Sequence, residues 1–269
     1  WKATESNTLG TRSYNEQRFG QRIEYVFDNT LSTGINLLNG TRYKVYTELV
    51  KGTQIQVEEP FSFDFKNGYM GIIGLDFRHY QPILRKSVFA VRLAGEISYG
   101  TERILNILGG VDNWLLPDFN KNIPLPQGQN IAYQTIAPGI RGFAYNIRNG
   151  SSYAVLNAEF RVPLFRYISE KIRSSFIRNF QLVGFFDAGT AWEGFSPFAK
   201  DNPINTIYLE NPPTVKLKVN YYRDPVVAGF GFGARTSLLG YFIRADYGYG
   251  IETKVIGKPI FYLAFGTDF

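Results

Sequence analysis

The chain has 269 residues, of which 16% are aromatic, together with 27 glycines and no cysteine. This composition is typical of strands and turns, and the absence of cysteine from the sequence excludes disulfide bonds and thiol chemistry. The net charge of +6 does not indicate nucleic-acid binding, because basic and acidic residues are interleaved along the chain and form no continuous basic stripe.

Hydropathy excludes a membrane-spanning helix and leaves a membrane β-barrel open. The sequence contains no run of about 18 apolar residues, the length that a spanning helix needs. A transmembrane strand exposes only every second residue to lipid. The mean hydropathy of −0.17 is therefore compatible with a barrel as well as with a soluble protein.

Alternating apolar and polar residues predict nine β-strands, because successive side chains of a strand point to opposite faces. In the segment 87–99, Phe89 and Leu93 lie on one face, whereas Arg92 and Glu96 lie on the other. The predicted strands span residues 18–28, 41–50, 69–80, 87–99, 153–164, 181–192, 226–238, 241–250 and 261–269.

The pattern favours an all-β fold, namely a transmembrane antiparallel β-barrel. The apolar faces are rich in aromatic residues, as interfacial girdles require, and the opposite faces carry charges of both signs, as a wet interior allows. A soluble β-sandwich also alternates and is the alternative interpretation. The connections 81–86, 165–178 and 237–240 are short or moderate, whereas 51–68, 101–149 and 193–225 are long. Short turns on one side and long loops on the other are typical of outer-membrane barrels.

Five motifs follow one another in an order that resembles a known family. They are Phe27-Asp28-Asn29-Thr30 followed by Asn39-Gly40-Thr41-Arg42, then Ile140-Arg141-Gly142-Phe143, then Asn157-Ala158-Glu159-Phe160 with Pro163, then Phe185-Phe186-Asp187-Ala188-Gly189-Thr190-Ala191-Trp192, and finally Phe261 to Phe269. Across residues 17–269 the chain resembles the BamA/TamA-type bacterial surface antigen family. In these outer-membrane barrels an inward-folded loop carries an Arg-Gly-Phe or Arg-Gly-Tyr tip.

The resemblance implies a location in the bacterial outer membrane and a barrel of about sixteen strands. If Phe269 ends in the periplasm, as in this family, nine strands place the start of the chain outside the cell. An open nine-stranded sheet also leaves two unpaired edges in lipid, which is not tolerated. We therefore expect residues 1–269 to be the C-terminal part of one barrel domain, with 101–149 as its inward-folded loop. Its N-terminal strands and any periplasmic domain are then absent from this sequence.

The resemblance also implies a function without covalent chemistry. Members of this family assist the insertion or translocation of client outer-membrane or secreted proteins, with outer-membrane lipid and accessory assembly subunits as further partners. Their first and last strands pair poorly, so the seam can template an incoming strand. The last predicted strand resembles the β-signal that the assembly machinery reads, with Phe261, Leu263, Phe265, Gly266 and Phe269 as its residues. The alternative is a barrel that serves mainly as an anchor or secretion pore for a soluble domain fused upstream.

Alternation by itself places Glu159 and Asp187 on the interior faces of their strands. A guanidinium offers a rigid fork of donors, so Arg141 inserted between these carboxylates would pin the long loop across the interior. Gly142 would permit a close approach to the wall, and Phe143 would pack beside it. Two alternatives remain, namely that Arg141 lies in a solvated loop and that the tip is purely architectural.

Catalytic and metal-binding interpretations have little support. His79 is the only histidine of the chain, and it falls on the apolar face of its predicted strand. No Ser-His-Asp arrangement and no histidine-based metal site is therefore expected. We expect the protein to be no enzyme and to need no cofactor and no metal.

Two further patterns have simpler explanations than chemistry. The glycines of the segment 229–233 share one face of a strand with no helix after it, which indicates a close approach or curvature rather than nucleotide binding. Asp76 and Glu96 resemble an acid–base pair. Arg78 and Arg92 accompany them, which favours a ladder of interior charges.

Overall fold

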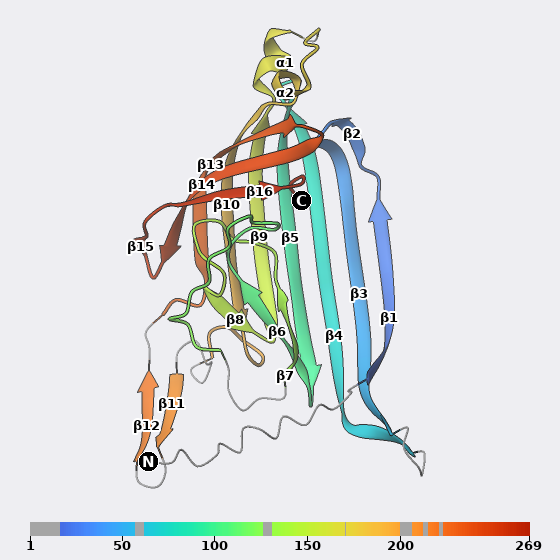
Figure 1. Ribbon diagram of the computed structural model, residues 1–269, viewed down its shortest axis with the longest axis vertical. Helices are drawn as coiled ribbons and strands as arrows, with labels where there is room; N and C mark the ends of the chain where they lie inside the picture. Colours follow the sequence, from blue (N-terminus) through green and yellow to red (C-terminus); the bar gives the residue numbers. More distant parts are fainter. Residues whose placement is uncertain are drawn as a thin grey trace, which may run out of the picture.

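An antiparallel sheet of 11 strands makes up most of the protein (Figure 1). The computed structural model describes residues 17–56, 62–125, 131–169, 171–199, 206–211, 215–220 and 223–269. Expectations for the first sixteen residues, and for parts of the three long connections, fall outside these ranges. Within them the fold is mostly β, as the alternation predicts.

The main sheet contains all nine strands that alternation predicts. They are β1 (Gln17–Asp28), β3 (Leu37–Gln56), β4 (Ser62–Ile83), β5 (Ser87–Gly100), β9 (Ser152–Val162), β10 (Gln181–Trp192), β13 (Val227–Leu238), β14 (Tyr241–Glu252) and β16 (Ile260–Phe265). They pair in this order, each with the next. Two short strands complete the sheet, with β2 (Leu31–Gly34) paired to β3 and β15 (Val255–Ile256) paired to β14.

The connections contain further elements that the sequence does not predict. The segment 101–149 holds β6 (Arg103–Leu108), β7 (Ile131–Ile136) and β8 (Arg148–Gly150), which form a small sheet of their own. The segment 193–225 holds a hairpin of β11 (Thr206–Asn211) and β12 (Val215–Asn220). Two short helices, α1 (Leu164–Ile168) and α2 (Ser175–Arg178), lie between β9 and β10. Neither helix of the described chain is long and apolar enough to cross a bilayer.

The two ends of the main sheet differ in their connections. The turns between β4 and β5 and between β13 and β14 lie at one end, and α1 and α2 project beyond the same end (Figure 1). The β11–β12 hairpin lies beyond the opposite end (Figure 1). This arrangement agrees with the predicted alternation of short and long connections.

One predicted connection is wrong in length. The segment 51–68 was expected to be a long loop, but β3 continues to Gln56 and β4 begins at Ser62. Only residues 57–61 of this segment lie outside the described strands. The loop is therefore much shorter than the sequence suggested.

Two strands end earlier than predicted. β9 stops at Val162, because Pro163 has no N–H for the ladder, and α1 begins at the next residue. β16 stops at Phe265, because Gly266 adopts a φ of 95° and turns the chain inward.

Large apolar side chains cover the outer face of the sheet, from β1 to β16. Those that are exposed are Phe19, Ile23, Tyr25, Phe27, Val45, Leu49, Tyr69, Ile73, Leu75, Phe89, Leu93, Ile97, Tyr99, Leu156, Leu182, Phe186, Phe230, Phe232, Leu238, Tyr241, Tyr247, Phe261 and Phe265. Within most strands they alternate with residues that face inward, as the period of a β-strand requires.

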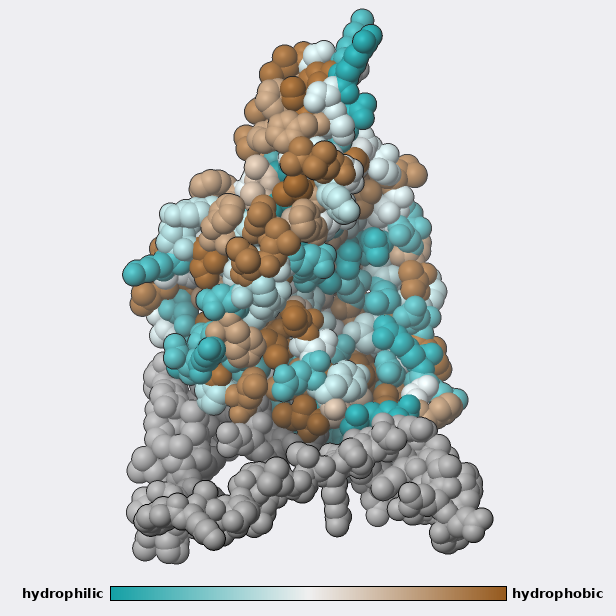
Figure 2. Space-filling view, in the orientation of Figure 1, coloured by the Kyte–Doolittle hydropathy of each residue, from teal (hydrophilic) through white to brown (hydrophobic). Residues whose placement is uncertain are grey.

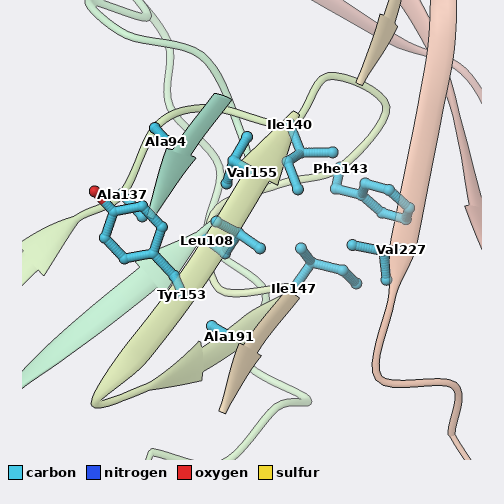
Figure 3. Close-up of a cluster of buried hydrophobic side chains, with 10 residues drawn as sticks. All are labelled: Ala94, Leu108, Ala137, Ile140, Phe143, Ile147, Tyr153, Val155, Ala191 and Val227. Atoms are coloured by element: carbon cyan, nitrogen blue, oxygen red, sulfur yellow. The ribbon is translucent and has the colours of Figure 1, made fainter. Parts of the chain in front are cut away.

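The inner face of the sheet packs against the segment 101–149. A cluster of buried apolar side chains joins the two (Figure 3). Leu108 and Ile140 come from the segment, and Val155 and Val227 come from the sheet. Burial of each such side chain contributes about 1.5–3 kcal/mol to folding. The cluster therefore holds the segment 101–149 against the inner face of the main sheet.

Candidate functional site: the loop tip and a buried ion cluster

The structure brings Arg141 together with Glu159 and Asp187 on the inner face of the sheet. Arg141 Nε lies 2.7 Å from Asp187 Oδ2, and its Nη2 lies 2.8 Å from Asp187 Oδ1. Its Nη1 donates to Glu159 Oε1 at 2.5 Å. The backbone N–H of Arg141 also donates to Asp187 Oδ2, at 3.0 Å. The tip is thus bound through both its side chain and its main chain.

The surroundings of the guanidinium keep it charged. Burial alone would lower the pKa of Arg141, but the charges of Asp187 and Glu159 outweigh burial and hold this pKa well above its usual value. The guanidinium carbon lies 3.8 Å from the centre of the Phe185 ring, a cation–π contact in a desolvated place. Asn157 adds a hydrogen bond of 2.9 Å to Asp187 Oδ1.

Gly142 lets the tip approach the wall closely. Its φ is 97°, and a side chain there would collide with the backbone of Tyr249 and Gly250. Its N–H donates to the Tyr262 hydroxyl at 2.8 Å, and this hydroxyl donates to the carbonyl oxygen of Phe143 at 2.9 Å. Tyr262 belongs to β16, so the tip is tied to the last strand of the sheet.

Glycines of β13 and β14 face the tip on the inner face of the sheet. A side chain at Gly229 would overlap the carbonyl oxygen of Arg141. At Gly250 it would meet the ring of Phe143, which is buried. These contacts agree with the expectation that the segment 229–233 permits a close approach.

The ion pairs continue beyond the three predicted residues. Glu159 Oε2 accepts a hydrogen bond from Arg161 Nε at 2.8 Å. Arg235 Nη2 lies 3.9 Å from Glu159 Oε1. Arg235 binds Asp246 at 2.7 Å and Asp268 at 2.8 Å. Alternation places most of these side chains inside, but their pairing depends on strand register, which alternation leaves open.

The resulting buried ion cluster is electrically balanced. Its four cations are Arg141, Arg161, Arg235 and Arg244, and its four anions are Glu159, Asp187, Asp246 and Asp268. No member is more than 9% exposed. A buried charge without a partner is strongly destabilising, so the members depend on one another. A void of about 40 Å³ beside Arg141 leaves little room for a ligand within the cluster.

The predicted β-signal residues divide between the two faces of the sheet. Phe261 and Phe265 are exposed on the outer face, and Leu263 lies half-buried between them. Phe269 was expected on the same face, and this expectation is wrong. Its ring packs on the inner cluster around Tyr80, because the turn at Gly266 redirects the chain.

Residues 268 and 269 are held by Arg161 of β9, by Arg244 of β14 and by Asn36 of the turn between β2 and β3. Arg161 Nη2 donates to the carbonyl oxygen of Phe269 at 3.2 Å. The Asn36 amide donates to Asp268 Oδ2 at 2.8 Å, and the Asp268 N–H donates back to Asn36 Oδ1 at 3.0 Å. Arg244 completes the set, at 3.1 Å from Asp268 Oδ1. The end of the chain is therefore part of the ion cluster.

The other candidate residues form polar contacts on their strands. Asp76 binds Arg78 at 2.7 Å and Arg92 at 2.8 Å. Glu96 does not join this group, and it accepts a hydrogen bond of 2.6 Å from the Tyr46 hydroxyl. The expected charge ladder is therefore present for Asp76, Arg78 and Arg92, whereas Glu96 lies outside it.

His79 also has a simple partner, the hydroxyl of Thr41 at 2.8 Å from Nδ1. Among the described residues, no group of three or more metal-ligating side chains is gathered in one place.

Comparison with known proteins adds no family, because no family model and no curated protein matches the chain.

Proposed function

We propose that the protein is a bacterial outer-membrane β-barrel protein whose main sheet forms barrel wall. The observation that carries this proposal is the apolar outer face, which continues from β1 to β16. A soluble protein rarely exposes a contiguous apolar patch of more than a few hundred Å². Lipid is the solvent that stabilises such a face.

The inner face supports the same proposal. In a soluble sandwich the buried face of each sheet is apolar and packs on the other sheet. Here the inner face carries the buried ion cluster and packs on the segment 101–149. Apolar residues outside and polar residues inside are the arrangement of a membrane barrel.

The two edge strands of the sheet indicate that a barrel would need further strands. Among the strands of the described residues, β1 pairs with β3 alone, and β16 pairs with β14 alone. In a bilayer both edges need strand partners, because lipid supplies no hydrogen bonds. We propose that a barrel of about sixteen strands provides them.

Within this class we propose that the protein assists the insertion or translocation of client proteins. Support comes from the resemblance of the motif order to the BamA/TamA-type family and from the tie between the tip and β16 through Tyr262. Movement of the tip would change the hold on the last strand. An edge strand that is released in this way can pair with an incoming strand.

A second candidate is a barrel that anchors or exports a fused soluble domain. The ion cluster favours it, because buried and balanced charges make the tip a static brace. An anchor needs no movement of the tip. The two candidates therefore differ in whether the tip has to move.

Membrane insertion is tested by fractionation of cells that make the full chain. We expect the protein in the outer-membrane fraction, resistant to urea extraction and released by detergent. We also expect faster migration of the unheated protein in a denaturing gel. Release into buffer without detergent would make the soluble β protein the correct interpretation.

The two roles are separated by reconstitution into lipid vesicles. An insertase should speed the folding of an added, urea-unfolded outer-membrane barrel, compared with vesicles that contain an unrelated barrel of similar size. It should lose this activity when a cysteine pair crosslinks the tip to β16. Equal folding rates in all vesicles would favour the anchor.

A further inference from the structure

A basic cavity of about 340 Å³ lies between one end of the sheet and the helical connection. The helices α1 and α2 project beyond this end (Figure 1). The turns before β3 and between β4 and β5 form its walls together with the helical connection. Arg85, Lys86, Arg166 and Arg178 line it, and no acidic residue does. None of these residues belongs to the buried ion cluster.

Within the described ranges, the guanidinium of Arg166 donates hydrogen bonds to uncharged groups alone. Its guanidinium donates to the carbonyl oxygens of Thr33 at 3.1 Å and Arg178 at 3.3 Å, and to the Asn179 amide oxygen at 3.5 Å. No carboxylate of the described chain forms an ion pair with it. Burial lowers the pKa of Arg166, and the neighbouring charge of Arg178 lowers it further. The cavity thus holds positive charges near each other.

The cavity is preformed by hydrogen bonds between its walls. Lys86 Nζ donates to the carbonyl oxygen of Arg166 at 2.6 Å. The Ser87 N–H donates to the Tyr167 hydroxyl at 3.1 Å. Arg85 has a φ of 65°, which fixes the direction of the turn. A ligand would therefore meet the cations already in place.

We infer that this cavity binds a phosphate ester. Guanidinium groups bind phosphate oxygens with two parallel hydrogen bonds, and several cations around one cavity suit a group with one or two negative charges. The side chains of Arg85 and Arg178 have no hydrogen-bond partner in the described part of the protein. They are free to turn toward a ligand.

The surroundings favour a lipid as the source of the phosphate. Leu84 is 69% exposed and Ile168 is 75% exposed beside the cavity. Figure 2 shows apolar residues gathered over the projecting segment. In the proposed barrel this end lies at the level of lipid headgroups. The phosphate site itself does not depend on that proposal, and only the lipid source does.

The test uses two double variants of the full chain with the same loss of charge. Arg85→Gln with Arg178→Gln removes two cations from the cavity without removing any hydrogen bond of its walls. Lys171→Gln with Arg173→Gln removes two exposed cations from the same connection, neither of which lines the cavity. Circular dichroism checks that both variants fold.

Three probes are titrated against the purified proteins. Phosphatidylglycerol and diacylglycerol, which lacks the phosphate, are added in detergent micelles, and bound lipid is measured by native mass spectrometry. Inorganic phosphate is measured by calorimetry. We expect phosphatidylglycerol to bind the unchanged protein and the control variant alike. Binding to the cavity variant should weaken at least about tenfold, because two charge-assisted hydrogen bonds are lost.

The outcomes separate the sources of the ligand. Saturable binding of inorganic phosphate with the same dependence on the cavity arginines would identify a soluble phosphate compound as the ligand. The inference is overturned if neither phosphatidylglycerol nor phosphate binds saturably, if diacylglycerol binds as well as phosphatidylglycerol, or if the two double variants lose equal affinity. Failure of membrane insertion in the fractionation experiment would leave the phosphate titration unaffected.

Discussion

Arg141 and Asp187 are joined by three hydrogen bonds, from the backbone N–H at 3.0 Å, from Nε at 2.7 Å and from Nη2 at 2.8 Å. One carboxylate therefore fixes both the position of the loop backbone and the direction of its side chain. A flexible ammonium group does not reproduce this geometry. The pair determines where the segment 101–149 meets the wall.

Replacement of Arg141 should loosen this segment. In Arg141→Ala, Glu159 loses one partner and Asp187 remains buried without its cation, which costs about 3–5 kcal/mol. We expect a lower midpoint of urea unfolding in detergent and faster proteolysis within 101–149. The unfolding midpoint of Arg141→Lys should lie between those of the unchanged protein and Arg141→Ala. Arg103→Ala is the control, because it removes an ion pair whose cation is 41% exposed and whose anion, Glu193, keeps its hydrogen bond from Ser151, so it should change the midpoint less. Equal midpoints for the variants of Arg141 and Arg103 would contradict the conclusion that Arg141 holds the segment 101–149 in place.

Charge balance predicts a partial rescue within the ion cluster. Arg235→Leu should destabilise the protein, because Asp246 and Asp268 lose a shared cation. A second change, Asp246→Asn, removes one of the unpaired charges and should restore about 0.5–3 kcal/mol. A double-mutant cycle of unfolding free energies measures this coupling. Additive effects would mean that the cluster members act independently.

A methyl group at Gly229 should displace the tip. Gly229→Ala places a carbon onto the carbonyl oxygen of Arg141, and overpacking of this kind costs about 1–3 kcal/mol. Gly184→Ala, on the neighbouring strand β10, is a matched control because its added carbon meets nothing within 4 Å. Protease sensitivity of the segment 101–149 should rise only in the first variant. An unchanged digestion pattern in Gly229→Ala would show that the tip does not lie against β13.

The Tyr262 hydroxyl should couple the tip to the last strand. Tyr262→Phe leaves the buried Gly142 N–H without this partner, at about 1–3 kcal/mol, whereas the Phe143 carbonyl keeps its hydrogen bond from the Gly110 N–H. We expect faster amide hydrogen exchange at residues 142–143 and in β16. The exposed Tyr241 offers the control change Tyr241→Phe, which should leave both regions protected. If exchange rises at the tip but not in β16, the coupling is absent.

Alternation alone identifies the nine main strands, because a strand repeats every two residues and each has one apolar face. The same argument places Glu159 and Asp187 inside. It failed over 51–68, where Pro60 and Gly68 suggest a loop although β4 runs through Gly68. Proline and glycine indicate a loop less reliably than pairing with a neighbouring strand indicates a strand.

Contacts between distant residues are not visible in the sequence pattern. Asn36 meets Asp268 because the turn before β3 and the end of the chain lie at the same end of the sheet. Alternation specifies a face but neither the register nor the strand order. Phe269 fits the apolar alternation of its segment, yet the positive φ at Gly266 sends it inward. The basic cavity is also formed by two turns and the helical connection, which only the fold brings together.

The hydrogen bonds between Asn36 and Asp268 also set an order of events during synthesis. They join positions separated by 232 residues, so they form only after nearly the whole described chain has been made. Until then Arg235 and Arg244 lack their shared anion. A chain interrupted before this point keeps an excess of buried positive charge. The charge balance of the inner face is therefore completed late, when Asp268 meets Asn36 and the two arginines.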